Sequence, residues 1–365
     1  MTKIKDLTRY LETIAPLAYQ ESYDNSGLLV GNPNTEIKGV LISLDCTEEI
    51  VREAVEKGCN VIVSHHPIVF KGLKKFTGSN YVERTVILAI KNDVALYAIH
   101  TNLDNVLPGV NRKLAEKIGL QDLKILDQKL DTLTKLVTFT PKENREDVLA
   151  AMHKAGAGNI GDYNSCSFRS TGTGRFVPGK NADPHIGEPG KMEEVEEERI
   201  EVIFPTYLKY GIIDALTAAH PYEEVAYYLT SLQNANQETG SGMIGSLEHP
   251  MPEDYFIERL KEIFGLKVIR HTKFLGKPIK KVAVCGGSGS FLTRKAISKQ
   301  ADIFITSDIK YHEYFDAEDK IILADIGHYE SEIATTELLE HIIKEKFTTF
   351  AVCLTTNTTN PILYT

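Results

Sequence analysis

Five side chains of types that bind metal ions lie in two parts of the sequence that are far apart. They are His65, His66, Asp104, His328 and Glu332. Each comes after a short apolar run that is typical of a buried β-strand. In α/β sheets, ligands bind at the carboxyl ends of the strands, so we predict that the two parts meet at one metal site.

The last two of these residues are spaced for a shared helix face. His328 and Glu332 are four residues apart at the start of an expected long helix that runs to about Glu345, so both should lie on the same side of it. Taken alone, such a pair is more often an ordinary solvated His–Glu pair. We interpret the pair as metal-binding only because of the candidate ligands in the first part of the sequence.

The first three follow two expected strands. His65 and His66 come directly after the strand at 61–64, so each imidazole could bind a different ion, or one could be a spectator. Asp104 follows the strand at 94–99, and its carboxylate could bridge two cations or cap the next turn. His100 is closest to that strand end and could orient a ligand, carry a proton or be a further ligand, and we expect the first of these roles.

The number and types of these ligands favour two ions over one. Three imidazoles and two carboxylates are too many for a tetrahedral zinc that keeps an open position. They suit two ions about 3.5–4 Å apart. Imidazole with carboxylate favours zinc, iron, manganese or nickel over magnesium and calcium, and we expect zinc.

Further polar residues at strand ends could support the site. Asp45, Asp308 and Asp325 could orient ligand histidines or cap helices. The run Gly286–Ser290 lies between an expected strand and a helix to about Gln300. Its residues Gly287 and Ser288 could contact a substrate phosphate, or the run could be only a tight turn.

The pattern of apolar runs predicts an α/β protein with an inserted domain. The outer segments alternate strands and helices, and their near-continuous apolar strands indicate largely parallel sheets with flanking helices. The middle segment has the order β-α-β-β-α-β of a ferredoxin-like α+β unit. Its acidic run Glu193–Glu198 is expected to be a solvated strand edge. The predicted boundaries are 1–127 and 247–365 for the two halves of the α/β domain, and 128–246 for the insert.

Composition limits the function classes. The net charge of −9 argues against nucleic-acid binding, which normally needs a basic face. No apolar run is long enough to span a membrane, and residues 1–9 do not resemble a signal peptide. Five widely spaced cysteines without a CxxC motif are typical of buried thiols in a reducing compartment. We therefore expect a cytoplasmic protein.

Three motifs around these residues resemble the NIF-three-like family, whose members are often called GTP cyclohydrolase I type 2 homologues. The motifs are Ser64-His65-His66-Pro67, His100-Thr101-Asn102-Leu103-Asp104 and His328-x-x-x-Glu332, with Tyr23-Asp24-Asn25-Ser26-Gly27-Leu28 as a weaker fourth. The chain departs from the family pattern at Tyr23, where Trp is usual, and at Ser307, where Gly is frequent. The resemblance implies a dinuclear metal centre held by the five ligand residues and a toroidal homohexamer. The run His220–Ala226 is similar to the signature of inserts that resemble PII and CutA proteins and tend to form trimers.

Two functions remain open. The first is a metal-dependent hydrolase that activates water for attack on a nucleotide-like or cyclic amide or amidine substrate, with His100 moving protons. The second is a non-catalytic regulatory or assembly protein whose PII-like insert binds a small effector or a partner. The family label does not identify a substrate.

Overall fold

The computed structural model describes all residues from Met1 to Thr365, and the chain divides into two compact units. Unit 1 combines Met1–Asp127 with Glu238–Thr365, and unit 2 is Gln128–Gln237. The sequence boundary near residue 246 falls inside strand β10 (Gly240–Met251) of unit 1. This strand pairs with a neighbour in a sheet of unit 1, which is why the segment belongs there.

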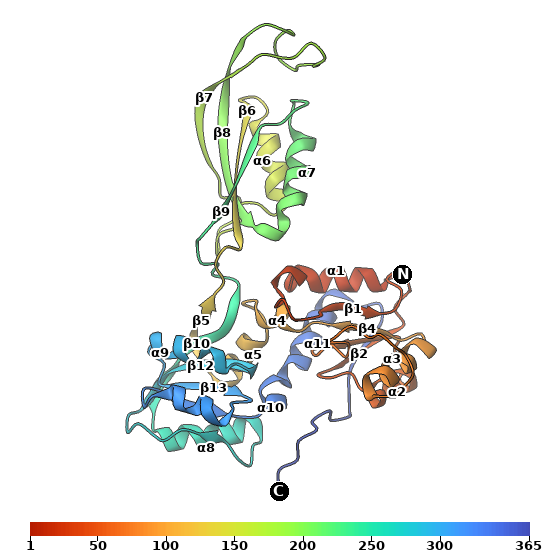
Figure 1. Cartoon of the computed structure of the whole chain (residues 1–365), viewed down its shortest axis with the longest axis vertical. Coiled ribbons are helices and arrows are strands. Elements are labelled where there is room, and N and C mark those ends of the chain that lie inside the picture. Colours follow the sequence, from red (N-terminus) through yellow and green to blue (C-terminus); the bar gives the residue numbers. More distant parts are fainter. The chain divides into compact units, whose positions relative to one another are not determined.

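The first sheet of unit 1 has the order β1-β4-β3-β2-β15 (Figure 1). Its strands are β1 (Gly27–Val30), β2 (Gly39–Ser43), β3 (Val61–Ser64), β4 (Ala95–Ala98) and β15 (Ala351–Leu354). Only the edge strand β1 is antiparallel to its neighbour, and the others pair in parallel. The carboxyl ends of β3 and β4 therefore lie at the same edge of the sheet.

Helices cover both faces of this sheet. Alternate strand residues pack against α1 (Ile4–Ile14) and α11 (Ala334–Lys346) on one face. The other residues pack against α2 (Glu48–Glu56) and α3 (Tyr81–Lys91). The helix starts follow from local chemistry, because the Thr47 hydroxyl accepts from the Ile50 amide and the Asn80 side chain accepts from the Glu83 amide.

The second sheet of unit 1 has the order β11-β14-β13-β12-β10-β5. The remaining strands are β5 (Gln121–Gln128), β11 (Arg270–His271), β12 (Ile279–Ser288), β13 (Ile303–Ser307) and β14 (Ile322–Asp325). Strands β12, β13 and β14 are parallel, whereas β10 and β11 pair antiparallel to them. The predicted α/β class is confirmed, with antiparallel strands added beside the parallel core.

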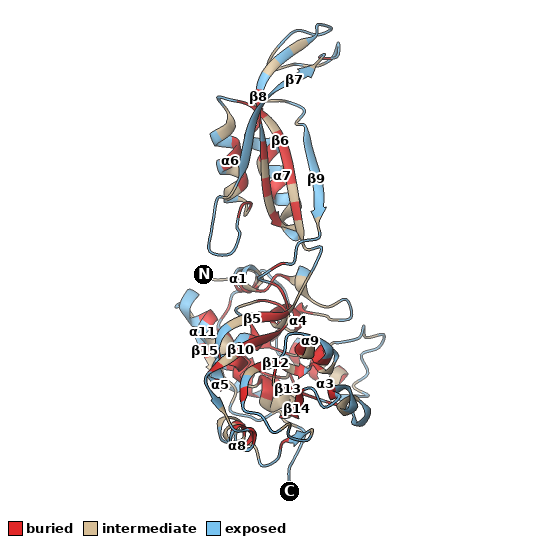
Figure 2. Ribbon diagram, turned by 90° about the vertical axis from the view of Figure 1, so that its left-hand side faces the viewer, coloured by how far each residue is buried: buried red, intermediate tan, exposed pale blue.

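Buried residues concentrate on β12 and β13 in the middle of the second sheet (Figure 2). Helices α5 (Val110–Ile118) and α8 (Glu253–Phe264) pack on one face. Helix α9 (Thr293–Ser298) and the 3-10 helix η4 (Tyr311–Ala317) pack on the other. Short elements complete the unit: α4 (Thr101–Asp104), α10 (His328–Glu332), and the 3-10 turns η1 (Leu17–Tyr19) and η3 (Ser290–Leu292).

Two local expectations from the sequence were wrong. The expected long helix after β14 is two helices, α10 and α11, separated at Ile333. The strand expected to end at Cys285 continues as β12 through Gly286 and Gly287 to Ser288, and the helix expected to reach about Gln300 is the six-residue α9, which ends at Ser298. Regular parallel pairing stops at Val284 opposite Ile305 and resumes at Ser288 opposite Ser307, so Gly286 and Gly287 lie in an irregular part of the strand.

Unit 2 has the element order β6 (Leu133–Pro141), α6 (Arg145–Lys154), β7 (Phe168–Phe176), β8 (Glu193–Pro205), α7 (Lys209–Ala219) and β9 (Tyr227–Leu232), with a 3-10 turn η2 (Thr206–Leu208). The strands form an antiparallel sheet in the order β7-β8-β6-β9. One face packs against α6 and α7 through Ile200, Val202 and Phe204. The acidic run Glu193–Glu198 is part of β8, and Glu197 and Glu198 are buried, which contradicts the expectation that the whole run is solvated.

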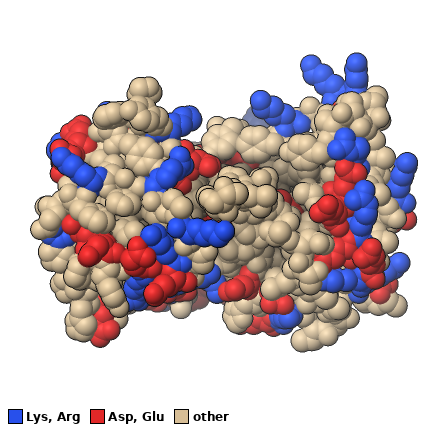
Figure 3. All heavy atoms as spheres, turned by 90° about the horizontal axis from the view of Figure 1, so that it is seen from below, with Lys and Arg blue, Asp and Glu red and all other residues tan.

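None of the helices combines the length and apolar character that crossing a membrane requires. On the face of the molecule in Figure 3, Lys and Arg alternate with Asp and Glu over the surface. That face therefore carries no broad region of a single charge.

Candidate metal centre

The candidate metal centre lies at the ends of three strands of unit 1. His65 and His66 follow β3, Asp104 ends the short helix α4 beyond β4, and His328 and Glu332 are the first and last residues of α10. Their ligand atoms gather into two groups with one shared member, His66–His328–Glu332 and His65–Asp104–Glu332. All five predicted ligand residues therefore lie together.

The first group is tight. Glu332 Oε2 lies 3.0 Å from Nε2 of His66 and 3.0 Å from Nε2 of His328. The two imidazole Nε2 atoms are 3.3 Å apart. Ligands about 2.0–2.1 Å from a tetrahedral ion are separated by about 3.3 Å, so these three atoms have the spacing of one coordination sphere.

The second group is slightly wider. His65 Nε2 lies 3.6 Å from Asp104 Oδ1 and 3.8 Å from Glu332 Oε1. Each group thus uses a different oxygen of Glu332. The carboxylate that can bridge two ions is that of Glu332, whereas the sequence suggested Asp104 for this role.

The burial of these atoms also fits a bound cation. His65 Nε2, Asp104 Oδ1 and Glu332 Oε2 are buried and make no hydrogen bond. Buried polar atoms normally have partners, because losing water without a replacement is unfavourable. Metal ions between these atoms would satisfy all three at once.

Each ligand histidine is oriented through its other ring nitrogen. Nδ1 of His66 lies 2.8 Å from Asp45, Nδ1 of His328 lies 2.7 Å from Asp308, and Nδ1 of His65 lies 2.8 Å from the backbone oxygen of Ile99. A donor bond from Nδ1 leaves Nε2 free for a metal, as in other metal sites.

Asp45 and Asp308 therefore lie where the sequence suggested, but Asp325 does not contact a ligand histidine. Its carboxylate pairs with Arg270 and accepts hydrogen bonds from the backbone amides of Ile309 and Gly327. Because Gly327 precedes His328, Asp325 holds the start of α10 through the backbone instead.

The ligand side chains influence each other's pKa values. Burial would lower the pKa of His66, but its contacts with Asp45 and Glu332 outweigh burial and raise it to about 9. The same balance, with Asp308 and Glu332 as partners, raises the pKa of His328 to about 11. Burial and the charge of Glu332 raise the pKa of Asp104, while the surrounding histidines keep that of Glu332 low despite its burial. Protons on His66 and His328 offset the charge of Glu332 in the metal-free site, and a bound metal ion would replace these protons.

The glycine run of β12 contacts Ser331 and Glu332 of α10. The Gly287 amide donates to Ser331 Oγ, and its carbonyl accepts from Thr306 and Ser307. Gly287 has φ 61°, and a Cβ there would collide with the Glu332 carboxylate. The absence of a side chain at Gly287 therefore leaves room for the Glu332 carboxylate. Of Gly287 and Ser288, which the sequence suggested as substrate contacts, only Ser288 is exposed.

Sequence reasoning missed the role of Asp24. Its buried carboxylate lies 2.7 Å from Nδ1 of His100 and also accepts hydrogen bonds from Ser26 and Thr101. Burial alone would raise the pKa of Asp24, but these bonds outweigh it and lower the value. A ring nitrogen of His100 lies within 4.8 Å of ligand atoms of His65 and His66. Asp24 therefore orients a histidine next to the metal ligands, and its only signal in the sequence was the weak fourth motif.

An exposed aromatic ring, Phe70, lies beside His100, and a second, Tyr23, lies beside Phe70. Phe70 has its ring centroid 6.2 Å from that of His100, and Tyr23 lies 6.2 Å from Phe70. The exposed fractions of Tyr23 and Phe70 are 64% and 42%. Large exposed aromatic rings next to a polar centre are suited to contact a planar ligand.

Known proteins resemble this chain over its whole length. A sequence model described as Duf34/NIF3 (NGG1p interacting factor 3) matches residues 2–361. A protein of Halalkalibacterium halodurans named GTP cyclohydrolase 1 type 2 homolog is 38% identical over 340 residues, covering 92% of this chain and 91% of that protein. One of the same name from Bacillus subtilis is 36% identical over 365 residues, covering 99% and 98%.

Solved structures agree with these matches. A Bacillus cereus protein related to NIF3 superposes with a TM-score of 0.87 at 36% identity, covering 100% of this chain and 99% of the other. A Staphylococcus aureus protein superposes with a TM-score of 0.80 at 32% identity and the same coverage. The resemblance drawn from the motifs is confirmed.

Proposed function

We propose, on the premise that this chain belongs to the DUF34/NIF3 family, that it is a hydrolase with a dinuclear metal centre. The substrate class that fits is a nucleotide-like molecule or a cyclic amide or amidine. The name GTP cyclohydrolase 1 type 2 homolog, carried by relatives, is consistent with that class.

The five ligand residues would hold two transition-metal ions, with Glu332 shared between them. Zinc suits this mixture of imidazole and carboxylate, and iron, manganese and nickel are the alternatives. When bound, such ions lower the pKa of a water molecule toward neutrality and polarise a phosphoryl or amide-like oxygen. Two observations support this assignment. The N···O distances from Glu332 to His66 and His328 are short, and several buried polar atoms of the group have no hydrogen-bond partner.

His100 would move the protons of the reaction. Its Nδ1 is committed to Asp24, so Nε2 is the atom left to accept a proton from water and return it to the leaving group. Asp24 fixes the ring and its tautomer. His100 belongs to neither of the two groups that contain Glu332, so those groups are complete without it, and this is the observation that favours catalysis over a purely structural centre.

Tyr23 and Phe70 would bind the substrate. Both are exposed and Phe70 lies next to His100, so their rings can stack on a planar heterocycle. Stacking of a nucleobase on one aromatic side chain contributes about 1–3 kcal/mol. This supports a ring-containing substrate over a simple phosphate ester.

The test is a hydrolysis screen with the metal-loaded chain against nucleoside triphosphates and cyclic amidines. The Asp104→Ala and His328→Ala variants should have no activity, and a Glu330→Gln variant should retain it because Glu330 bonds to Asn360 and is not one of the clustered ligands. Turnover that persists in the first two variants would contradict the proposal.

The assembly that goes with this function is a cytoplasmic homohexamer, as the family resemblance implies. The alternative, a regulatory metal protein, predicts no turnover together with a change in oligomer size when metal is removed. Size-exclusion chromatography before and after chelation separates the two.

A further inference from the structure

Unit 2 contains a cavity of about 720 Å³. It lies on the face of the sheet opposite α6 and α7, beneath the connection between β7 and β8. Its volume is within the range of small-molecule sites, about 300–1,000 Å³. The rings of Phe139, Phe176, Tyr222 and Tyr228 line it, together with the imidazole of His185.

One carboxylate in this cavity is buried without a cation. Glu197 is 8% exposed, and its only hydrogen bond is from the Tyr222 hydroxyl to Oε1, at 2.8 Å. No lysine, arginine or histidine lies within ion-pair distance of it. Buried charges are normally paired, because an unpaired one loses its hydration without compensation.

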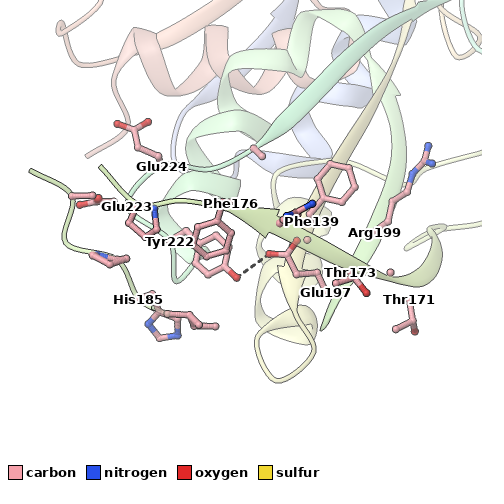
Figure 4. A pocket seen from close by; sticks show the side chains of 18 of the residues that line it. Phe139, Thr171, Thr173, Phe176, His185, Glu197, Arg199, Tyr222, Glu223 and Glu224 are labelled. Carbon is pink, nitrogen blue, oxygen red and sulfur yellow. Dashed lines mark hydrogen bonds between the residues drawn. The ribbon is translucent and has the colours of Figure 1, made fainter. Parts of the chain in front are cut away.

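The arginines that line the cavity have other partners. Arg199 pairs with Glu201 at 2.6 Å, and Arg175 lies 3.7 Å from Glu194. Figure 4 shows the Glu197 carboxylate between the ring of Phe139 and those of Phe176 and Tyr222, with the Arg199 guanidinium directed away from them. The interior therefore presents a negative charge among aromatic faces.

The backbone makes room for this carboxylate. Gly174 on β7 faces it across the sheet, and a Cβ at that position would collide with Glu197 Oε2. Any other residue at 174 would displace the carboxylate. Glu223 and Glu224 at the rim add acidic character, and Glu223 also fixes the connection by accepting from the Asp183 amide.

We propose that this cavity binds a small organic cation, an amine or amidine carried by an aromatic or aliphatic group. The cationic group would pair with Glu197, and its carbon skeleton would contact Phe139, Phe176 and Tyr222. Aromatic faces attract cations as well as apolar groups, so the rings and the carboxylate favour the same ligand. This site is separate from the metal centre and does not depend on the proposed hydrolysis.

Benzylamine is a suitable probe, with benzyl alcohol and benzoate as neutral and anionic analogues of the same shape. Ligand-observed NMR titrations of the full-length chain would measure the three affinities. We expect benzylamine to bind at least about tenfold more tightly than benzyl alcohol, and benzoate not to bind. In Glu197→Gln, the preference for the amine should fall below about twofold.

The matched control is Glu196→Gln, which removes the same charge from the neighbouring, exposed position of β8 and should keep the preference. If Glu197→Gln does not fold by circular dichroism, Gly174→Ala tests the same point, since its methyl group displaces the carboxylate and should weaken benzylamine about tenfold. Equal binding of amine and alcohol overturns the proposal. So does an absence of benzylamine binding, which is the result expected if a second copy of the chain fills the cavity.

Discussion

Replacing Glu332 with glutamine should remove both metal ions, whereas replacing Asp104 with asparagine should remove only one. Glu332 offers Oε2 to His66 and His328 and Oε1 towards His65, but Asp104 belongs to the second group alone. Apparent binding free energies of about 10–16 kcal/mol for four-ligand zinc sites give about 3 kcal/mol per ligand. Loss of one charged ligand should therefore lower the affinity for the ion about 10²-fold.

The assay is elemental analysis after dialysis against a buffer that holds free zinc at a fixed concentration. We expect two ions per chain in the unaltered protein, one in Asp104→Asn and none in Glu332→Gln. Glu330→Gln is the control, because it removes a carboxylate from the same short helix outside the cluster. Retention of an ion in Glu332→Gln, or loss of both in Asp104→Asn, would refute the shared-carboxylate arrangement.

Three further predictions concern single side chains. Asp24→Asn should lower kcat about 10²–10⁴-fold with unchanged metal content, because it releases the His100 ring; loss of metal in this variant would instead indicate a ligand role for His100. Tyr23→Ala should raise KM about tenfold with little change in kcat, and steady-state kinetics that show the reverse would exclude stacking. Burial would raise the pKa of Glu53, but hydrogen bonds from Lys57, Thr355 and Thr356 lower it to about 2 from 4.5, so its stabilising effect is present above pH 4.5 and is lost as the pH falls towards 2. Urea unfolding of Glu53→Gln should thus show a loss of up to about 3 kcal/mol at pH 7 and a smaller loss at pH 3, and equal losses at both would contradict this.

The clustering of the five candidate ligands could be predicted because each of them lies in a short stretch with a recognisable sequence pattern. His65 and His66 follow an apolar strand directly, and parallel strands bring their carboxyl ends to one edge of a sheet. The i, i+4 spacing of His328 and Glu332 survives the break in the helix, since both residues lie within α10. These features depend on short stretches of chain, so both the α/β fold class and the position of the ligand cluster could be predicted.

Other features depend on contacts between distant residues and could not be predicted. Asp24 meets His100 across 76 positions of sequence, and nothing in the periodicity around Asp24 indicates this contact. Glu197 belongs to an acidic run that is typical of a solvated edge, but the connection between β7 and β8 covers it. The sequence around Gly287 is compatible with a phosphate contact or a tight turn, but in the structure the Glu332 carboxylate occupies the space beside it. In each case tertiary packing determines the role.

The most direct test of a dinuclear centre is a crystal structure of the chain purified without chelators, with anomalous diffraction data collected at the absorption edge of the metal found. Two anomalous peaks are predicted, one between His66, His328 and Glu332 and the other between His65, Asp104 and Glu332. A single peak, or peaks away from Glu332, would contradict the central claim.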